Sequence, residues 1–298
     1  MKISRNSMIL AAVILAAFVQ QAIAQSLSGV PAPGLAIAPG QAKKLPILLG
    51  TTGACNNVNQ GGPCTQTSTL VQLDPETGAL IKTIGPVGFT VNGLAWDRTS
   101  GTLYASTAIG DVTFHGLITI NPKKGTGTPV DPNLHNFGLA GADSPIHSIA
   151  IDVFGHMVGW YDEFPTGAVT DTYVRINQHT GVATEFTATG IDTSQNGVSF
   201  GEFNLLWNID SPRGKPVTQT AYILNPFDGK PLFSRLLSPP TAAALGDFHP
   251  GNNLYYGLNF TAFDPTVPTF IEVVDVLAGT VTTLGQTVDD LHTLTFIP

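Results

Sequence analysis

Two imidazoles and one amide, those of His147, His292 and Asn92, occupy the same place in three related apolar segments of the chain. Each stands four residues before the large apolar residue that closes its segment, so a repeated fold would bring all three side chains to one place. Neutral imidazole is a common ligand of transition metals. Asn92, His147 and His292 are therefore candidate ligand-binding residues, with His147 and His292 as candidate metal ligands. The alternative is structural, because buried histidines are usually satisfied by backbone carbonyls.

A second set of candidates is a pair of carboxylates, Glu202 and Asp247, each one residue before a phenylalanine in such a segment. Paired carboxylates are the working groups of glycoside hydrolases, one as the acid and the other as the base or nucleophile. Glu202 and Asp247 are therefore the candidate catalytic residues. A turn-capping or solvated role is the alternative. The chain contains no Gly-x-Ser-x-Gly elbow, His-Glu-x-x-His helix, phosphate-binding Gly loop or haem-binding Cys-x-x-Cys-His.

These candidates are positioned by an internal repeat. In each copy a four-residue strand segment is followed by Asp or Asn and, four residues further on, by Gly. The Asp or Asn positions recur at intervals of 47, 56, 48 and 50 residues. Such a period is typical of propellers and other repeat folds. The copies are Leu70–Gly78, Leu117–Gly125, Tyr173–Gly181, Ala221–Gly229 and Ile271–Gly279.

Each copy predicts a strand, a tight turn and a second strand. The Asp or Asn caps the turn with its own side chain, and the Gly adopts the positive φ that the turn needs. A further hairpin precedes the copies, most clearly in residues 93–97 and 102–107. Four short antiparallel strands in about 50 residues make one propeller blade.

The two ends of the repeat region predict how the ring closes. Residues 45–50 match the second strand of a unit, whereas residues 291–296 match the innermost strand. The C-terminal strand is therefore expected to complete the first blade, which leaves no long free sheet edge. The prediction is an all-β fold, a β-propeller over residues 45–298 with five four-stranded blades, or one more or fewer if the longest interval contains an irregular unit. A β-sandwich is the alternative, but it does not predict a regular period.

The chain resembles the secreted β-propellers with Asp-Pro-x-Thr-Gly turns, such as the YVTN and quinoprotein-like repeat families. The resemblance rests on Asp74-Pro-Glu-Thr-Gly78 and its degenerate copies along residues 45–298. It implies a propeller, and since those families include enzymes, sensors and adhesive scaffolds, it implies no single function. Quinoprotein dehydrogenases usually carry Trp shortly after the Thr-Gly, where this chain has Ala79-Leu-Ile-Lys82, so no quinone cofactor is expected.

Residues 89–94 and 103–107 also resemble the opening blade of the plant and bacterial type of glutaminyl cyclotransferase, a five-bladed family. That family typically has Glu at the position of Ala105. The resemblance therefore implies the architecture and not the cyclisation activity.

The first residues predict export. Lys2 and Arg5 precede an apolar run over residues 8–19, and Ala22-Ile-Ala24 follows, which is the order of a secretory signal peptide. We expect residues 1–24 to be removed, which leaves a secreted or periplasmic protein without a membrane span, because the apolar run is too short to cross a bilayer. Residues 25–44 contain several Pro and Gly and predict an extended arm or linker.

Cysteine and charge narrow the chemistry further. Cys55 and Cys64 are the two cysteines, and in an oxidising compartment we expect them to form a disulfide that closes a small loop. A net charge of −8 without a basic run argues against nucleic acid as a partner. No cofactor is predicted, and a divalent metal is left open by the two histidines.

Three functions are compatible with the sequence. The leading hypothesis is an exported, non-catalytic propeller that acts as a binding or structural module at the cell exterior, with a protein, a glycan or a small molecule as its partner. The first alternative is a lyase or hydrolase at the mouth of the central tunnel, metal-dependent if His147 and His292 converge there. The second is a subunit of an extracellular assembly that associates with itself through residues 25–44.

Overall fold

The computed structural model describes residues 45–53, 67–107, 114–139, 146–161, 171–191, 197–210, 220–239, 243–259 and 268–298. The chain separates into two units, residues 1–44 and 45–298, and all of the described structure belongs to the second. The predicted signal peptide, the predicted arm and the predicted Cys55–Cys64 disulfide lie outside the described residues. In the part that is described, no helix has the length and apolar content needed to cross a membrane.

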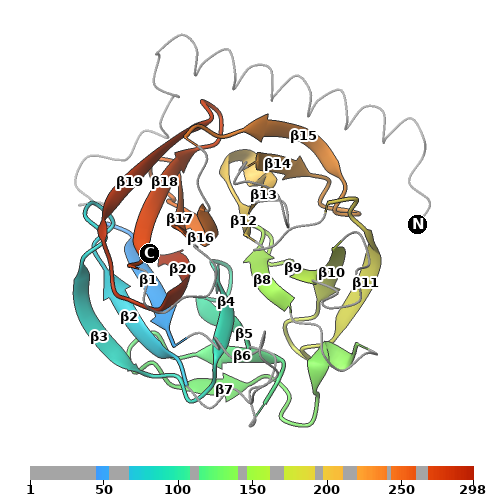
Figure 1. Cartoon of the computed structure of the whole chain (residues 1–298). Coiled ribbons are helices and arrows are strands. Elements are labelled where there is room, and N and C mark those ends of the chain that lie inside the picture. Colours follow the sequence, from blue (N-terminus) through green and yellow to red (C-terminus); the bar gives the residue numbers. More distant parts are fainter. Residues whose placement is uncertain are drawn as a thin grey trace, which may run out of the picture. The chain divides into compact units, whose positions relative to one another are not determined.

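The described strands form five four-stranded antiparallel sheets, which are the blades of a propeller (Figure 1). Blade 1 consists of β20 (Leu291–Ile297), β1 (Ile47–Thr52), β2 (Thr69–Leu73) and β3 (Leu80–Pro86), from the innermost strand outward. Blade 2 consists of β4 (Val91–Asp97), β5 (Thr102–Thr107), β6 (Leu117–Ile120) and β7 (Gly127–Pro129). Blade 3 consists of β8 (Ile146–Ile151), β9 (Met157–Tyr161), β10 (Thr172–Ile176) and β11 (Ala183–Ala188). Blade 4 consists of β12 (Val198–Phe200), β13 (Leu206–Asp210), β14 (Thr220–Leu224) and β15 (Pro231–Leu236), and blade 5 of β16 (Ala243–Phe248), β17 (Tyr255–Asn259), β18 (Phe270–Asp275) and β19 (Thr280–Gln286).

The ring closes through the C-terminal strand, as the sequence predicts. Strand β20 pairs antiparallel with β1, with Phe296 opposite Leu48 and Leu294 opposite Gly50. The innermost strands β20, β4, β8, β12 and β16 contact one another in that order, and β16 contacts β20 to complete the circle. The predicted all-β fold with five four-stranded blades is therefore confirmed.

The five predicted turn residues all cap their turns. In every copy a side-chain oxygen of the Asp or Asn accepts a hydrogen bond from the backbone N–H two residues on, at 2.8 to 3.0 Å. The Gly that ends each turn has a φ between 70° and 85°, a conformation that costs little only for glycine. The capping residues are Asp74, Asn121, Asn177, Asn225 and Asp275.

The hydrophobic core lies between the faces of neighbouring blades. One buried cluster joins Tyr104 of blade 2 to Ile149 and Val174 of blade 3, and another joins Trp160 of blade 3 to Leu206 of blade 4. This arrangement follows from strand alternation, because successive side chains point to opposite faces of a sheet and each face packs on a different neighbour.

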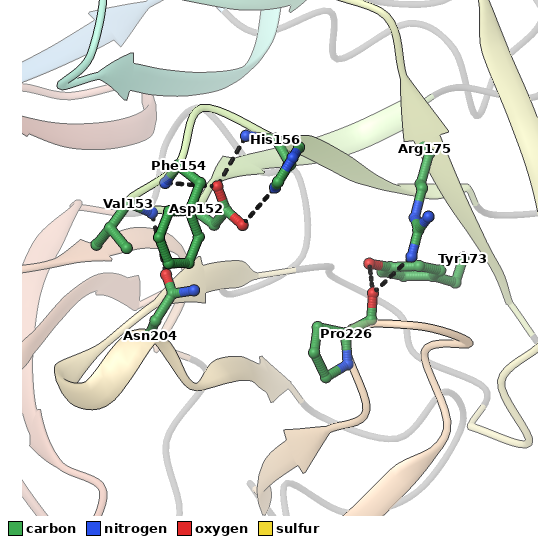
Figure 2. Close-up of polar contacts among 8 residues, drawn as sticks. All are labelled: Asp152, Val153, Phe154, His156, Tyr173, Arg175, Asn204 and Pro226. Carbon is green, nitrogen blue, oxygen red and sulfur yellow. Dashed lines mark hydrogen bonds and ion pairs between the residues drawn. The ribbon is translucent and has the colours of Figure 1, made fainter. Parts of the chain in front are cut away.

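Polar contacts also join blades 3 and 4, as Figure 2 shows. The Tyr173 hydroxyl donates to the Pro226 carbonyl at 2.7 Å, and the Arg175 guanidinium donates to the same oxygen at 3.4 Å. Nearer to the ring centre, the Val153 backbone N–H donates to Asn204 Oδ1 at 3.0 Å. The last contact joins two hairpin loops that also line the cavity described below.

Candidate functional site

A cavity of about 450 Å³ lies at the carboxyl ends of the innermost strands. Its lining comes from residues 94–96 and 98 of blade 2, 149–153 of blade 3, 198–204 of blade 4 and 246–251 and 253 of blade 5, together with Phe296 of blade 1. Ligand sites in proteins usually have volumes of about 300 to 1,000 Å³, so this cavity is large enough for a small molecule.

Four of the lining residues stand at one level of the ring. Ala95, Ala150, Ser199 and Asp247 each lie one residue before the large apolar residue that pairs with the next strand near the carboxyl end of the inner strand, which is Trp96, Ile151, Phe200 or Phe248. Thr295 has the same place in β20. Blades 2 and 3 therefore contribute methyl groups at this level, whereas blades 4, 5 and 1 contribute a continuous polar arc.

This register corrects one part of the sequence alignment. Sequence spacing places Glu202 at the ring level of Asp247, but β12 ends at Phe200, which pairs with Leu206, and Ser199 takes that level instead. Glu202 lies in the loop between β12 and β13, in the 3-10 turn Glu202–Asn204. The two candidate catalytic residues line the same cavity, one in a strand and the other in a hairpin loop.

The Asp247 carboxylate is the centre of the polar arc. Its Oδ1 accepts hydrogen bonds from the Ser199 hydroxyl at 2.6 Å and the Phe248 backbone N–H at 2.8 Å. Its Oδ2 accepts hydrogen bonds from the Thr295 hydroxyl and the Phe296 backbone N–H, both at 3.0 Å. One carboxylate thus joins the innermost strands of blades 4, 5 and 1, and its four donors occupy the about four lone-pair positions that a carboxylate offers.

A bulge in β16 sets the position of Asp247. The pairing of β16 with β17 shifts between Ala244 and Asp247, and Leu245 has a φ of 52°, which is strained for a large side chain. At the next residue only glycine fits, since a Cβ on Gly246 would lie 1.8 Å from the carbonyl oxygen of Tyr256. Strained backbone of this kind persists where the surrounding structure holds it, and it is concentrated at functional sites.

Burial raises the pKa of the Asp247 carboxyl above its ordinary value. Burial is the largest effect on this pKa. The opposite effect, a lowering, comes from the hydrogen bonds of Ser199, Phe296 and Thr295 and from the charge of Arg98. The Arg98 side chain itself is exposed and lines the cavity.

The loop that carries Glu202 has an unusual backbone. Phe203 and Asn204 have φ values of 58° and 60°, and the Asn204 side chain is fixed by the Val153 N–H (Figure 2). Phe203 is 57% exposed at this mouth. The Asn253 amide of blade 5 donates a hydrogen bond to Glu202 Oε2 and so joins the two loops across the mouth.

A histidine and an aspartate on the rim are bound within their own turns. His249 Nδ1 accepts the backbone N–H groups of Gly251 and Asn252, both at 3.0 Å, so the proton of the neutral ring is on Nε2. Asp152 accepts the backbone N–H groups of Phe154 and His156 and binds the His156 ring at 2.9 Å (Figure 2). Both side chains therefore serve first as turn caps.

The imidazole and amide candidates lie toward the opposite ends of the innermost strands. Asn92 and His292 are buried near the starts of β4 and β20, His147 is near the start of β8, and none of the three lines the cavity. Burial and the charge of the neighbouring His147 lower the pKa of His292 to about 3. No group of three His, Cys, Asp or Glu side chains among the described residues could hold a metal ion. Metal binding at His147 and His292 would thus require other ligand types, such as Asn92.

Several residues of the cavity were not identified from the sequence, among them Arg98, Phe203, His249 and Asn253. The sequence does contain a signal for the rim residues of blades 4 and 5. The inner hairpins of blades 2 and 3 turn on Asp97 and Asp152, whereas those of blades 4 and 5 replace this Asp with other residues. The two irregular hairpins are the ones that carry the rim residues Glu202, Phe203, His249 and Asn253.

Comparisons with known proteins leave the family open. No protein-family profile matches the chain. No curated protein matches it in sequence. Among solved structures, TolB from Acinetobacter baumannii is 13% identical with a TM-score of 0.47, over 92% of this chain and 58% of that one.

Two GH43 enzymes are similar to a comparable degree. A GH43 β1,3-galactosidase is 11% identical with a TM-score of 0.47, over 66% of this chain and 49% of that one. An engineered GH43 glycoside hydrolase with endo-xylanase and exo-arabinofuranosidase activity is 10% identical with a TM-score of 0.46, over 68% of this chain and 43% of that one. The chain spans about half the length of these proteins. Because the TM-scores are below 0.5, the propeller assignment rests on the strand pairing of this protein itself.

Proposed function

We propose that this protein is an exported, non-catalytic binding module that takes up a small ligand in the cavity at the carboxyl ends of its innermost strands. Export follows from the signal-like order of residues 1–24. The binding site follows from the shape and polarity of one end of the ring.

The observation that supports the site most strongly is the bulge at Leu245 and Gly246. A regular strand would complete β16 without the strained φ of Leu245. The bulged strand instead directs Asp247 into a polar arc beneath a cavity whose rim loops carry Phe203 and Asn204 in left-handed backbone. Among the described residues, four of the seven non-glycine residues with positive φ lie on the cavity lining or next to it, namely Phe203, Asn204, Leu245 and Asn253, as expected near a functional site.

The bonding of the carboxylates favours binding over catalysis. An acid, a base or a nucleophile needs an oxygen that can reach the substrate. Both Asp247 oxygens are occupied by two donors each, all from the protein. Glu202 is exposed, but Asn253 holds one of its oxygens. Asp247 is therefore best suited to fix the geometry of the floor.

A hydrolase is the second candidate, and one observation favours it. The raised pKa of the Asp247 carboxyl, with Glu202 on the same cavity, is the arrangement in which one carboxyl donates a proton while the other stays ionised. A turnover that disappears in both the Asp247→Asn and the Glu202→Gln variants would support this candidate and contradict the non-catalytic proposal.

The proposal is tested by native mass spectrometry of the protein purified from the exterior of the cells that produce it. The wild type should carry a small-molecule adduct, and Arg98→Trp, which places a bulky ring at the cavity mouth, should lose it. Lys82→Trp is the matched control, because Lys82 is an exposed cation on the outer strand of blade 1. An adduct that survives Arg98→Trp, or a wild type without any adduct, would contradict the proposal.

A further inference from the structure

We infer that the ligand of this cavity is a neutral saccharide of one or two rings. The inference rests on the proposed binding function and adds the chemical class of the ligand. Exposed polar groups and apolar side chains lie together at the cavity mouth, and both kinds of surface are needed to bind a sugar.

Two of the three carboxylates on the lining, Asp152 and Asp247, are directed at donors of the protein itself. Asp247 is bonded to four protein donors, and Asp152 is bonded to two backbone N–H groups and the His156 ring. The exposed charged groups on the lining are one cation, Arg98, and one anion, Glu202. Because these two exposed side chains have opposite charges, they do not select for a ligand of either sign, and a ligand without net charge can bind to both.

The groups at the mouth suit hydroxyls in particular. A hydroxyl both donates and accepts, and Arg98 supplies only donors while Glu202 supplies only acceptors. The guanidinium is planar with N–H donors side by side, so it can hold two adjacent hydroxyls of one sugar ring, and the Glu202 oxygen that Asn253 does not hold can accept from a further hydroxyl. The Asn253 amide, which already holds Glu202 Oε2, fixes the acceptor in place and reduces the entropy lost on binding.

An apolar platform stands beside these polar groups. Phe203 and Val153 on the lining are 57% and 52% exposed, and Phe154, which follows Val153 outside the lining, is 73% exposed. The bond from the Val153 N–H to Asn204 joins the loop of Val153 and Phe154 to the loop of Phe203 (Figure 2). A pyranose ring has a face of C–H groups that packs on such an apolar surface while its hydroxyls reach sideways to polar groups.

Other ligand classes fit the cavity less well. A phosphate-bearing ligand needs several cations or a cluster of backbone N–H donors, and the lining offers one arginine in a chain of net charge −8. A hydrocarbon ligand would remove the exposed charged groups of Arg98 and Glu202 from water without giving them hydrogen-bond partners. The combination of apolar platform, balanced charges and polar floor matches a neutral polyhydroxyl compound.

The test is saturation-transfer NMR and calorimetry of the exported protein with defined sugars. The probes are xylobiose, cellobiose and lactose as neutral disaccharides, with glucuronate and glucosamine as charged counterparts. At least one neutral sugar should bind, with the charged sugars at least tenfold weaker. Phe203→Ala and Arg98→Gln should each weaken that binding about tenfold or more, and Phe203→Tyr should retain it.

The matched control is Phe227→Ala, because Phe227 is also exposed on blade 4 but lies outside the cavity lining, and it should bind like the wild type. Binding of only the charged sugars would overturn the neutral class while leaving the cavity as the site. The neutral class would also be overturned if the protein carried a native adduct that depends on Arg98 but bound none of the sugars. If the native adduct persists in both Phe203→Ala and Arg98→Gln, the proposed function itself is wrong.

Discussion

The Ser199 hydroxyl donates a 2.6 Å hydrogen bond to Asp247 Oδ1 and thereby joins the innermost strands of blades 4 and 5. Thr295 makes the matching bond to the other oxygen from blade 1, so one carboxylate holds three blades at the place where the ring closes. The same carboxylate lines the cavity. Asp247 therefore contributes both to the contacts among blades 4, 5 and 1 and to the floor of the proposed site.

Replacing Asp247 with Asn should destabilise the protein by about 1 to 3 kcal/mol, the cost of leaving a buried donor unsatisfied. Each carboxylate oxygen accepts one backbone N–H, from Phe248 or from Phe296. An amide has one acceptor oxygen, so its NH2 group must face one of these N–H donors. Urea denaturation measures the loss. The exposed Asp289→Asn serves as the control, and equal effects of the two substitutions would contradict this account.

The raised pKa of Asp247 gives stability a defined pH dependence. Between the ordinary carboxyl pKa of 3.8 and the raised value, the folded state binds more protons than the unfolded state, so the free energy of unfolding falls as pH rises through that window. Urea denaturation at a series of pH values, taken as the difference between the wild type and Asp247→Asn, should show this fall. A difference that rises with pH would show that the hydrogen bonds outweigh burial.

His292 should have the opposite effect. Its pKa is lowered to about 3, so the unfolded state binds more protons below the ordinary pKa of 6.5. The contribution of His292 is therefore fully present above pH 6.5 and is lost as pH falls toward about 3. His292→Gln should remove this part of the acid sensitivity, whereas His156→Gln, at an exposed ring, should retain it. Identical acid unfolding of the wild type and His292→Gln would contradict the prediction.

Gly246→Ala should damage the fold far more than an ordinary glycine substitution. The added Cβ would overlap the Tyr256 carbonyl oxygen in the bulge that positions Asp247. Gly88→Ala is the comparison, because nothing lies within 4 Å of its Cβ and its cost is limited to the positive φ of 86°, about 1 to 2 kcal/mol. Thermal denaturation should show the lower midpoint, or no cooperative transition, for Gly246→Ala. A smaller loss than in Gly88→Ala would mean that the bulge relaxes.

The blades could be predicted from the sequence because their signals are local. An Asp or Asn such as Asp74 caps its own turn, and the Gly four residues later has the positive φ of that turn. Each unit can therefore be recognised without its neighbours. The closure by residues 291–297 followed for the same reason, since a strand pattern without a blade of its own must pair elsewhere.

The site could be predicted only in part, because it depends on departures from the repeat. The spacing of the apolar residues indicates Glu202 and Asp247. It does not indicate the bulge at Leu245 or the 3-10 turn at Phe203, because neither feature changes the apolar pattern. Three of the four donors to Asp247 come from 48 or 49 residues away, in other blades. Periodicity does not fix such contacts, because they depend on the register between sheets.

The position of the bound ligand decides whether the protein binds at this end of the ring, and amide chemical-shift mapping of the mature protein measures it. On titration with the neutral disaccharide that binds most tightly, the largest shifts should cluster at Arg98, at residues 199–204 and at residues 247–253. Shifts centred on Asn92, His147 and His292 would place the site at the opposite mouth, and shifts spread over the outer strands would contradict a central site altogether.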